Sequence, residues 1–175
     1  RAGSQARTTG RHQGRNIADG CEMSRPPHHS PQAADAQKRV VRIGLVQSIC
    51  TPSQTDNCAQ ALAGIAAAAQ QGAEVVCLQE LFAGEYPCQS EDQTKFAQAQ
   101  SVPGPLTDLL AVAAKQYGVV ILGSVFERRT PGLFHNTAVV FEADGSLVGT
   151  YRKMHIPDDP HYYEKFYFAP GDTGF

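Results

Sequence analysis

The feature that most constrains the fold is a strand–helix–strand pattern early in the chain. The segment VVRIGLVQ (40–47) is an apolar run typical of a buried strand, and AEVVCLQ (73–79) is a second. Between them, an apolar stripe at helical spacing runs through 62–69, and Gly72 can end the helix. Two strands joined through one helix are expected to lie parallel in a single sheet.

The rest of the chain extends this pattern. We expect a short helix near 91–99, a longer one over 106–117, and a strand over 119–129. Residues 135–153 have the pattern of two strands joined at Asp144–Gly145, which favours a hairpin. The sequence therefore predicts an α/β domain with a helix-covered sheet, and it has no internal repeat.

Basic residues are concentrated at the start of the chain. Residues 1–42 hold eight of the 15 Lys and Arg but only three of the 17 Asp and Glu. We predict that 1–38 is a disordered basic tail, because it is polar and lacks an apolar period. A role in nucleic-acid binding or as a transit peptide is weaker, since the tail has no amphipathic face. Residues 1–22 are expected to lie outside the native protein, and 39–175 to form the ordered domain.

Composition narrows the class of partner. The formal net charge is -2, which gives no reason to expect nucleic acid. No apolar stretch approaches the ~18 residues of a membrane span, so no membrane is expected either. An odd number of cysteines without a Cys-x-x-Cys pair favours a reducing, cytoplasmic setting. The cysteines are at positions 21, 50, 58, 77 and 88.

Glu80 follows closely on the second apolar strand. In open α/β sheets ligands gather at the carboxyl ends of the strands, so this carboxylate is a candidate site residue. Lys153, at the end of the hairpin, is a candidate partner. Taken alone, the two residues fit a structural salt bridge as well as a catalytic pair.

Five motifs give these residues a context, in the order QELF, GSVFER, HNTAVVF, GTYRKMHIP and EKFYFAPGD. With this order and spacing, residues 40–175 resemble the nitrilase, or carbon–nitrogen hydrolase, superfamily. Within it, LQELFAGEYPCQ and YRKMHIPDDPHYYEKFYFAPGD are most similar to the N-carbamoylputrescine amidases. The resemblance implies a nitrilase-like α-β-β-α sandwich, of which this chain would be an incomplete N-terminal portion, and it implies no cofactor.

The resemblance also implies a Glu–Lys–Cys mechanism. Glu80 matches the general base, Lys153 the catalytic lysine, and Glu164 a second glutamate beside that lysine. A carboxylate must take the proton of a thiol, because a free thiol is mostly protonated at neutral pH. An ammonium then stabilises the oxyanion, and a second carboxylate keeps it charged.

The nucleophilic cysteine of that mechanism is expected on a strand after PGDTGF (170–175). We therefore expect this polypeptide to be a fragment that is inactive by itself and whose parent is an amidase. Cys77 is three residues from Glu80 and is predicted to face the other side of the sheet. Cys88 lies in a loop near the expected site, outside the context of the nucleophile.

Further polar and aromatic residues are candidates for substrate binding. Tyr86 and Tyr162 can line the entrance or be exposed loop residues, and His155 can support the site. Asp158 can attract a distal amine or serve the turn. His155, Asp158 and nearby acidic and histidine residues also raise the idea of a metal, but their spacing does not support one, so we expect none.

The leading hypothesis is a cofactor-free hydrolase of linear amide or ureido C–N bonds, acting on N-carbamoylputrescine in polyamine synthesis. β-Ureidopropionase-like and ω-amidase-like activities would use the same three groups. The rival is a non-catalytic nitrilase-fold module that binds a partner. A nucleotide-binding domain is remote, because no glycine-rich phosphate loop is present. The full-length protein is expected to form homo-oligomers.

Overall fold

A single mixed sheet organises the described residues. The computed structural model describes residues 39–174, so the predicted tail at 1–38 lies outside the described residues. The strand order is β1-β2-β3-β4-β5, with the first three strands parallel and the last three antiparallel. The parallel pair and the hairpin predicted from the sequence are confirmed. The strands are β1 (Ile43–Val46), β2 (Val75–Leu78), β3 (Val120–Thr130), β4 (Leu133–Phe141) and β5 (Leu147–Arg152).

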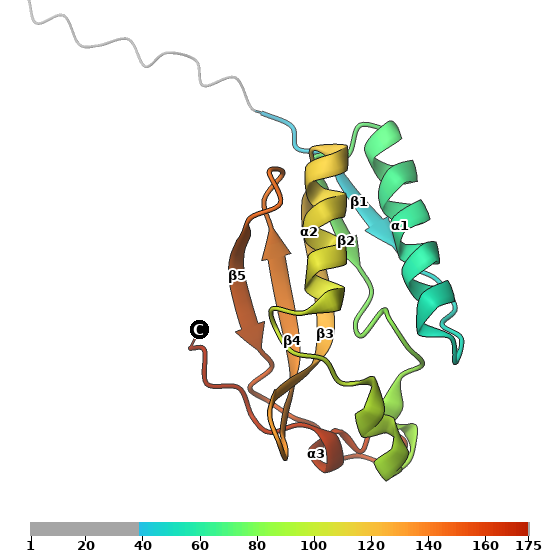
Figure 1. Ribbon diagram of the computed structural model, residues 1–175, viewed down its shortest axis with the longest axis vertical. Coiled ribbons are helices and arrows are strands. Elements are labelled where there is room, and N and C mark those ends of the chain that lie inside the picture. Colours follow the sequence, from blue (N-terminus) through green and yellow to red (C-terminus); the bar gives the residue numbers. More distant parts are fainter. Residues whose placement is uncertain (1–38, 175) are drawn as a thin grey trace, which may run out of the picture. The chain divides into compact units, whose positions relative to one another are not determined.

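Two helices, α1 (Gln54–Gln70) and α2 (Pro105–Tyr117), lie side by side on one face of the sheet (Figure 1). The Ser53 side chain accepts a hydrogen bond from the first turn of α1, as expected of a helix N-cap. Gly118 follows α2 with a positive φ of 63°, a conformation that favours glycine at a helix end. Both helices were predicted, with boundaries within a few residues.

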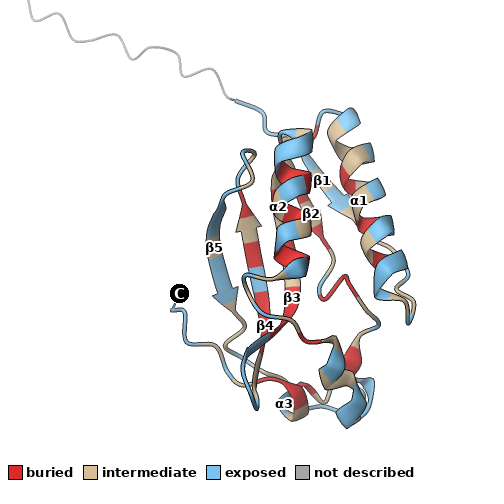
Figure 2. Cartoon of the chain, viewed as in Figure 1, coloured by how far each residue is buried: buried red, intermediate tan, exposed pale blue. Residues whose placement is uncertain are grey.

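The main core lies between these helices and the sheet. Ile65 of α1, Leu110 of α2 and Ile121 of β3 are fully buried there, and Figure 2 shows the buried positions on the sides of the helices that face the strands. Burying each such side chain stabilises the fold by roughly 2–3 kcal/mol before chain entropy is counted. This packing fixes the strands that carry the candidate site.

A second, aromatic cluster supports the lower end of the molecule in Figure 1. The one-turn helix α3 (Glu164–Tyr167) packs there against the 3₁₀ helices η1 (Pro87–Gln89) and η2 (Gln93–Gln98). The Tyr167 hydroxyl donates to the Ser90 carbonyl at 2.6 Å, which ties α3 to the loop after β2. The sequence predicted a short helix near η2 but not α3.

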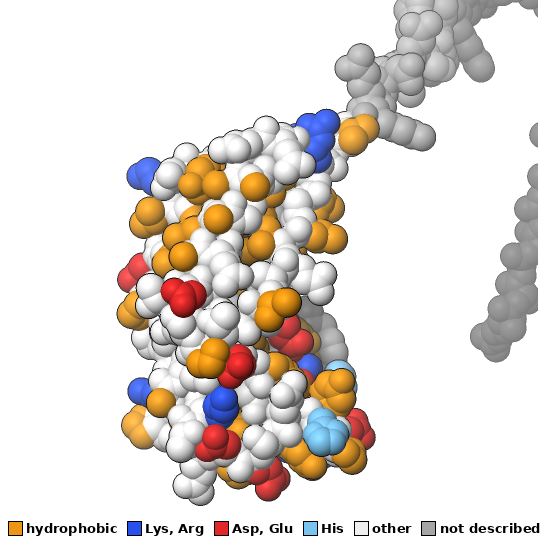
Figure 3. All heavy atoms as spheres, turned by 90° about the vertical axis from the view of Figure 1, so that its right-hand side faces the viewer, with side chains coloured by type: hydrophobic (Ala, Val, Ile, Leu, Met, Phe, Trp, Pro, Cys, Tyr) orange, Lys and Arg blue, Asp and Glu red, His pale blue; other side chains and the backbone are white. Residues whose placement is uncertain are grey.

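The opposite face of the sheet has no helix over it among residues 39–174. Ile43, Leu45 and Tyr151 are exposed. The described residues thus supply one helical layer and one sheet of the predicted four-layer sandwich. On the face shown in Figure 3, acidic side chains lie from about mid-height down to the end that holds α3. Among the described residues, no helix has the length and apolar character needed to cross a membrane.

Candidate active site

Glu80 stands two residues beyond the end of β2, where the chain turns sharply. Leu81 follows it with a φ of 51°, in the left-handed region that a leucine rarely adopts. The Asn136 side-chain amide of β4 donates to Glu80 Oε1, and Ser124 donates to Asn136 Oδ1 at 3.2 Å. The Glu80 side chain nevertheless remains 51% exposed. It is therefore a held carboxylate that is still accessible.

Lys153 immediately follows β5 and lies between two carboxylates. Its Nζ is 3.5 Å from Glu80 Oε1 and donates to Glu164 Oε1 at 2.9 Å. Burial alone would lower the pKa of Lys153, but the hydrogen bond to Glu164 and the charge of Glu80 outweigh it and raise that pKa. The ammonium is thus held in its charged form.

Glu164 is the buried member of the set. It begins α3 and is only 3% exposed. Besides Lys153, the Tyr86 hydroxyl donates to its Oε1 at 2.7 Å. Burial, together with this bond to a carboxylate, raises the pKa of Tyr86, so the phenol stays protonated as a donor. A buried carboxylate with these partners can orient the lysine without itself reaching solvent.

Glu80 lines two hollows. One, of about 390 Å³, is also lined by Cys50, Glu85 and Tyr86. The other, of about 290 Å³ on the helix-free face, is also lined by Cys77 and Lys153. Cys77 was predicted to face away from Glu80, and this was wrong. β2 ends at Leu78, so the alternation of strand side chains does not continue to Glu80.

Four cysteines lie among the described residues, and none shares a hydrogen bond with Glu80. Cys88 is fully buried, and burial raises the pKa of its thiol to about 12. The Cys50 thiol donates to the Phe82 carbonyl at 3.4 Å, and burial raises its pKa as well. The Cys77 thiol points toward the neighbouring Leu78 carbonyl at 3.5 Å. Neither Cys88 nor Cys50 is therefore set up as an activated thiolate.

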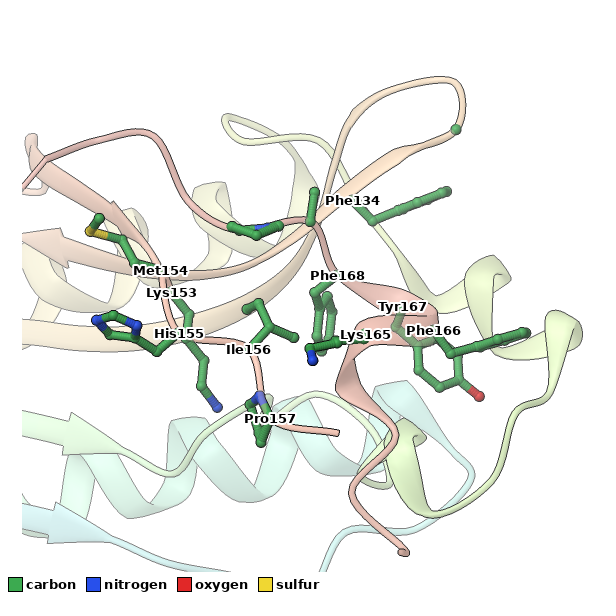
Figure 4. Close-up of a pocket in the computed structure, with 13 residues that line it drawn as sticks. Phe134, Lys153, Met154, His155, Ile156, Pro157, Lys165, Phe166, Tyr167 and Phe168 are labelled. Carbon is green, nitrogen blue, oxygen red and sulfur yellow. The ribbon is translucent and has the colours of Figure 1, made fainter. Parts of the chain in front are cut away.

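The predicted substrate-binding residues occupy different positions. Tyr86 joins the site through Glu164, and its ring centroid is 6.3 Å from that of the exposed Tyr162. His155 is exposed and lines a hollow of about 970 Å³ together with Lys153 and the α3 aromatics (Figure 4). Asp158 is exposed and lines none of these hollows. The substrate roles of these residues stay predictions.

The described residues offer no clustered set of metal-ligating side chains. Within residues 39–174, no three His, Cys, Asp or Glu side chains lie close enough together to hold a metal ion. The hydrogen-bonded set of Glu80, Lys153 and Glu164 instead offers a proton acceptor beside a fixed cation.

Asn136 joins the site through both its backbone and its side chain. From the sequence, it is expected to bond backbone near the start of its strand or to support the catalytic lysine. In the structure its carbonyl accepts from the Lys153 N–H at 2.9 Å, while its side chain donates to Glu80. The signal in the sequence was its place in the HNTAVVF motif, one of the five that carry the family resemblance.

A comparison over most of the sequence identifies the family. The profile of carbon–nitrogen hydrolases matches residues 42–175. The chain belongs to the carbon–nitrogen hydrolase family. This confirms the family predicted from the motifs around Glu80, Lys153 and Glu164.

Known relatives agree with this placement. The chain is 42% identical over 140 residues to the N-carbamoylputrescine amidase of Solanum lycopersicum, covering 79% of this chain and 46% of the relative. It is 34% identical over 136 residues to the citrullinase of Francisella tularensis subsp. tularensis, covering 77% and 47%. The chain thus spans about half the length of the curated relatives it matches.

A solved structure confirms the fold class. The crystal structure of a carbon–nitrogen hydrolase from Helicobacter pylori G27 superposes with a TM-score of 0.74 at 41% identity. The match covers 77% of this chain and 46% of that chain. The described residues therefore have the nitrilase-like α/β arrangement expected from the sequence.

Proposed function

We propose that the protein containing this chain hydrolyses a linear amide or ureido C–N bond, with Glu80 as general base and Lys153 as oxyanion stabiliser. The supporting observation is the position of the Lys153 ammonium between a buried and an accessible carboxylate, Glu164 and Glu80. Glu80 also lines two hollows, one of them together with Lys153, so a small molecule can reach both groups. This shared access favours the catalytic hypothesis over the non-catalytic module.

In the proposed reaction, Glu80 takes the proton of a cysteine thiol, and the thiolate attacks the carbonyl carbon. The Lys153 ammonium stabilises the oxyanion that forms. Glu80 returns the proton to the departing nitrogen, so that ammonia leaves and a covalent thiocarbamate or thioester remains. Water activated by Glu80 then cleaves this intermediate. Glu164 acts throughout by holding Lys153 charged and oriented.

We propose that the thiol comes from outside residues 39–174. Cys88 is buried with a raised pKa, and the Cys50 and Cys77 thiols are directed to backbone carbonyls. The family resemblance supports a nucleophile on a strand after the PGDTGF segment. The proposed mechanism therefore relies on a cysteine outside the described residues.

We propose N-carbamoylputrescine as the substrate, with ammonia, carbon dioxide and putrescine as products. The basis is the 42% identity to the tomato N-carbamoylputrescine amidase. The terminal amine of such a substrate is positively charged. Glu85, which lines one of the Glu80 hollows, and the exposed Asp158 are negative groups on the described surface that can favour a cationic substrate.

The test is release of ammonia by the full-length natural protein from N-carbamoylputrescine, citrulline, β-ureidopropionate and an ω-amide. We expect the highest kcat/KM for N-carbamoylputrescine. A higher value for one of the ureido acids or the ω-amide would replace the proposed substrate but keep the reaction class. Absence of turnover with all four would contradict the amidase proposal.

Site variants connect this activity to the geometry. Lys153→Met should lower kcat by about 10²–10³-fold, the effect of losing one oxyanion donor. Lys115→Met, on the exposed side of α2, is the matched control and should keep wild-type turnover. Equal kcat values for the two variants would show that Lys153 has no role in the mechanism.

A further inference from the structure

A second ionic cluster lies beside the candidate active site on the other face of the sheet. Glu127 of β3 is 1% exposed and accepts two hydrogen bonds from the Arg152 guanidinium, each at 2.7 Å. Thr137 of the intervening strand β4 also donates to Glu127. The three residues thus link β3, β4 and β5 through side chains. We call Glu127 and Arg152 the clamp.

The clamp is adjacent in sequence to the catalytic candidate. Lys153 continues the β4–β5 ladder through its N–H bond to the Asn136 carbonyl, and its side chain lines the helix-free hollow with Tyr151. Arg152, between these two residues, therefore points to the opposite face. A paired, mostly buried Arg152, with 17% of its side chain exposed, cannot rotate without breaking two charged hydrogen bonds. The direction of the Lys153 side chain is therefore tied to the clamp.

The segment after α3 adds to this fixation. Asp172 pairs with Arg152 at 3.3 Å, and the Arg152 backbone N–H donates to Thr173 Oγ1 at 3.0 Å. The Gly171 N–H donates to the Lys153 carbonyl at 2.9 Å. A Cβ at Gly171 would lie 1.9 Å from the Arg152 carbonyl oxygen, so only glycine permits this approach. The backbone of Lys153 is held from both sides.

We propose that Glu127 and Arg152 are positioning residues, which set the direction of the Lys153 ammonium from the opposite face of the sheet. The distances from the Lys153 ammonium to the Glu80 and Glu164 carboxylates depend on where β5 ends. The clamp fixes this end of the strand. The bidentate guanidinium fork suits this task, because it fixes orientation as well as distance, which a lysine in its place would not do. The inference rests on the proposed role of Lys153.

The experiment replaces both clamp residues at once in the full-length natural protein, as Glu127→Leu with Arg152→Met. Replacing a buried ion pair by apolar residues often leaves stability unchanged, whereas removing one partner does not. Arg39→Met is the matched control, because it breaks an exposed Arg–Glu pair, with Glu74, far from the site. The readouts are kcat, KM, the unfolding midpoint and acylation of Lys153.

We expect the double variant to lose about 10- to 100-fold in kcat, the cost of displacing a reacting group by about 1 Å, with KM and the unfolding midpoint kept. The single variant Arg152→Lys should be more active than the double variant but less active than the wild type. A kcat equal to that of Arg39→Met, at equal stability, would overturn the proposal. If the double variant does not fold, Arg152→Lys is tested by the same readouts.

Labelling separates this inference from the proposed function. Acetic anhydride modification of Lys153, measured by mass spectrometry relative to the exposed Lys115, should rise several-fold when the clamp is removed. An active wild-type enzyme is not needed for this result. Absence of ammonia release by the wild type would contradict the proposed function only. Unchanged labelling of Lys153 would contradict the clamp.

Discussion

Removing the Lys153 charge should destabilise the protein, because the buried Glu164 carboxylate then has no charged partner. In Lys153→Met, the Glu164 carboxylate stays 3% exposed and keeps only the neutral Tyr86 hydroxyl as a close donor. Breaking a fully buried pair costs about 3–5 kcal/mol. Because the Lys153 side chain is 33% exposed and Tyr86 remains, we expect a smaller loss of about 2 kcal/mol in unfolding free energy.

The assay is urea unfolding of the natural protein and its variants at one protein concentration, repeated between pH 5 and pH 8. In Lys153→Met, the midpoint should lie at a lower urea concentration than in the wild type at each pH, because the buried Glu164 carboxylate has lost its charged partner.

A double variant, Lys153→Met with Glu164→Gln, provides the control. It removes both charges and should recover most of the lost stability, while remaining inactive. The reasoning fails if Lys153→Met unfolds at the wild-type urea concentration at every pH. It also fails if the double variant is as unstable as the single one, since the loss would then not come from an uncompensated Glu164.

Three other changes test the remaining assignments. Glu80→Gln should lower kcat for ammonia release by about 10²–10⁴-fold. It should change the unfolding free energy by less than about 1 kcal/mol, because the Glu80 side chain is 51% exposed. Near-normal turnover with lost stability would show that the residue is structural. Cys88→Ala should keep kcat within about twofold, since a thiol with a pKa of about 12 is no ready nucleophile; loss of turnover without loss of folding would contradict this. Burial would raise the pKa of Glu127, but its bonds to Arg152 and Thr137 outweigh this and lower it, so its stabilisation is present above pH 4.5 and is lost as pH falls through the folded-state pKa. Acid unfolding of Glu127→Gln should therefore be less steep than that of the wild type, and identical acid profiles would count against this assignment.

Local signals were sufficient for most of the fold. The helix ends were visible as Gly72 after α1 and Gly118 after α2, and both have a positive φ in the structure. The start of α1 was expected at the polar residues 55–57, whereas its cap is Ser53. The one-turn helix α3 was missed, because four residues with no cap signal cannot be recognised from periodicity. Its position depends on aromatic contacts that are distant in sequence.

The site was predictable only as a set of residue types. The motifs named Glu80, Lys153 and Glu164, but no periodicity could bring together residues up to 84 positions apart, and the family resemblance was needed. The left-handed turn at Leu81 and the exchange between Asn136 and Glu80 depend on tertiary packing. The same applies to Tyr86, whose hydroxyl reaches Glu164 across 78 positions of sequence.

Asn136 has a consequence for how errors in folding would affect the protein. Its carbonyl accepts from the Lys153 N–H in the β4–β5 ladder, and its side chain donates to Glu80. The register of β4 and β5 therefore sets the distance between Glu80 and Lys153. A slip of β5 by one residue would turn Lys153 to the opposite face. Molecules with this wrong register would be inactive even if they were stable. Protection of the Lys153 amide from hydrogen exchange would report the fraction of molecules with the correct register.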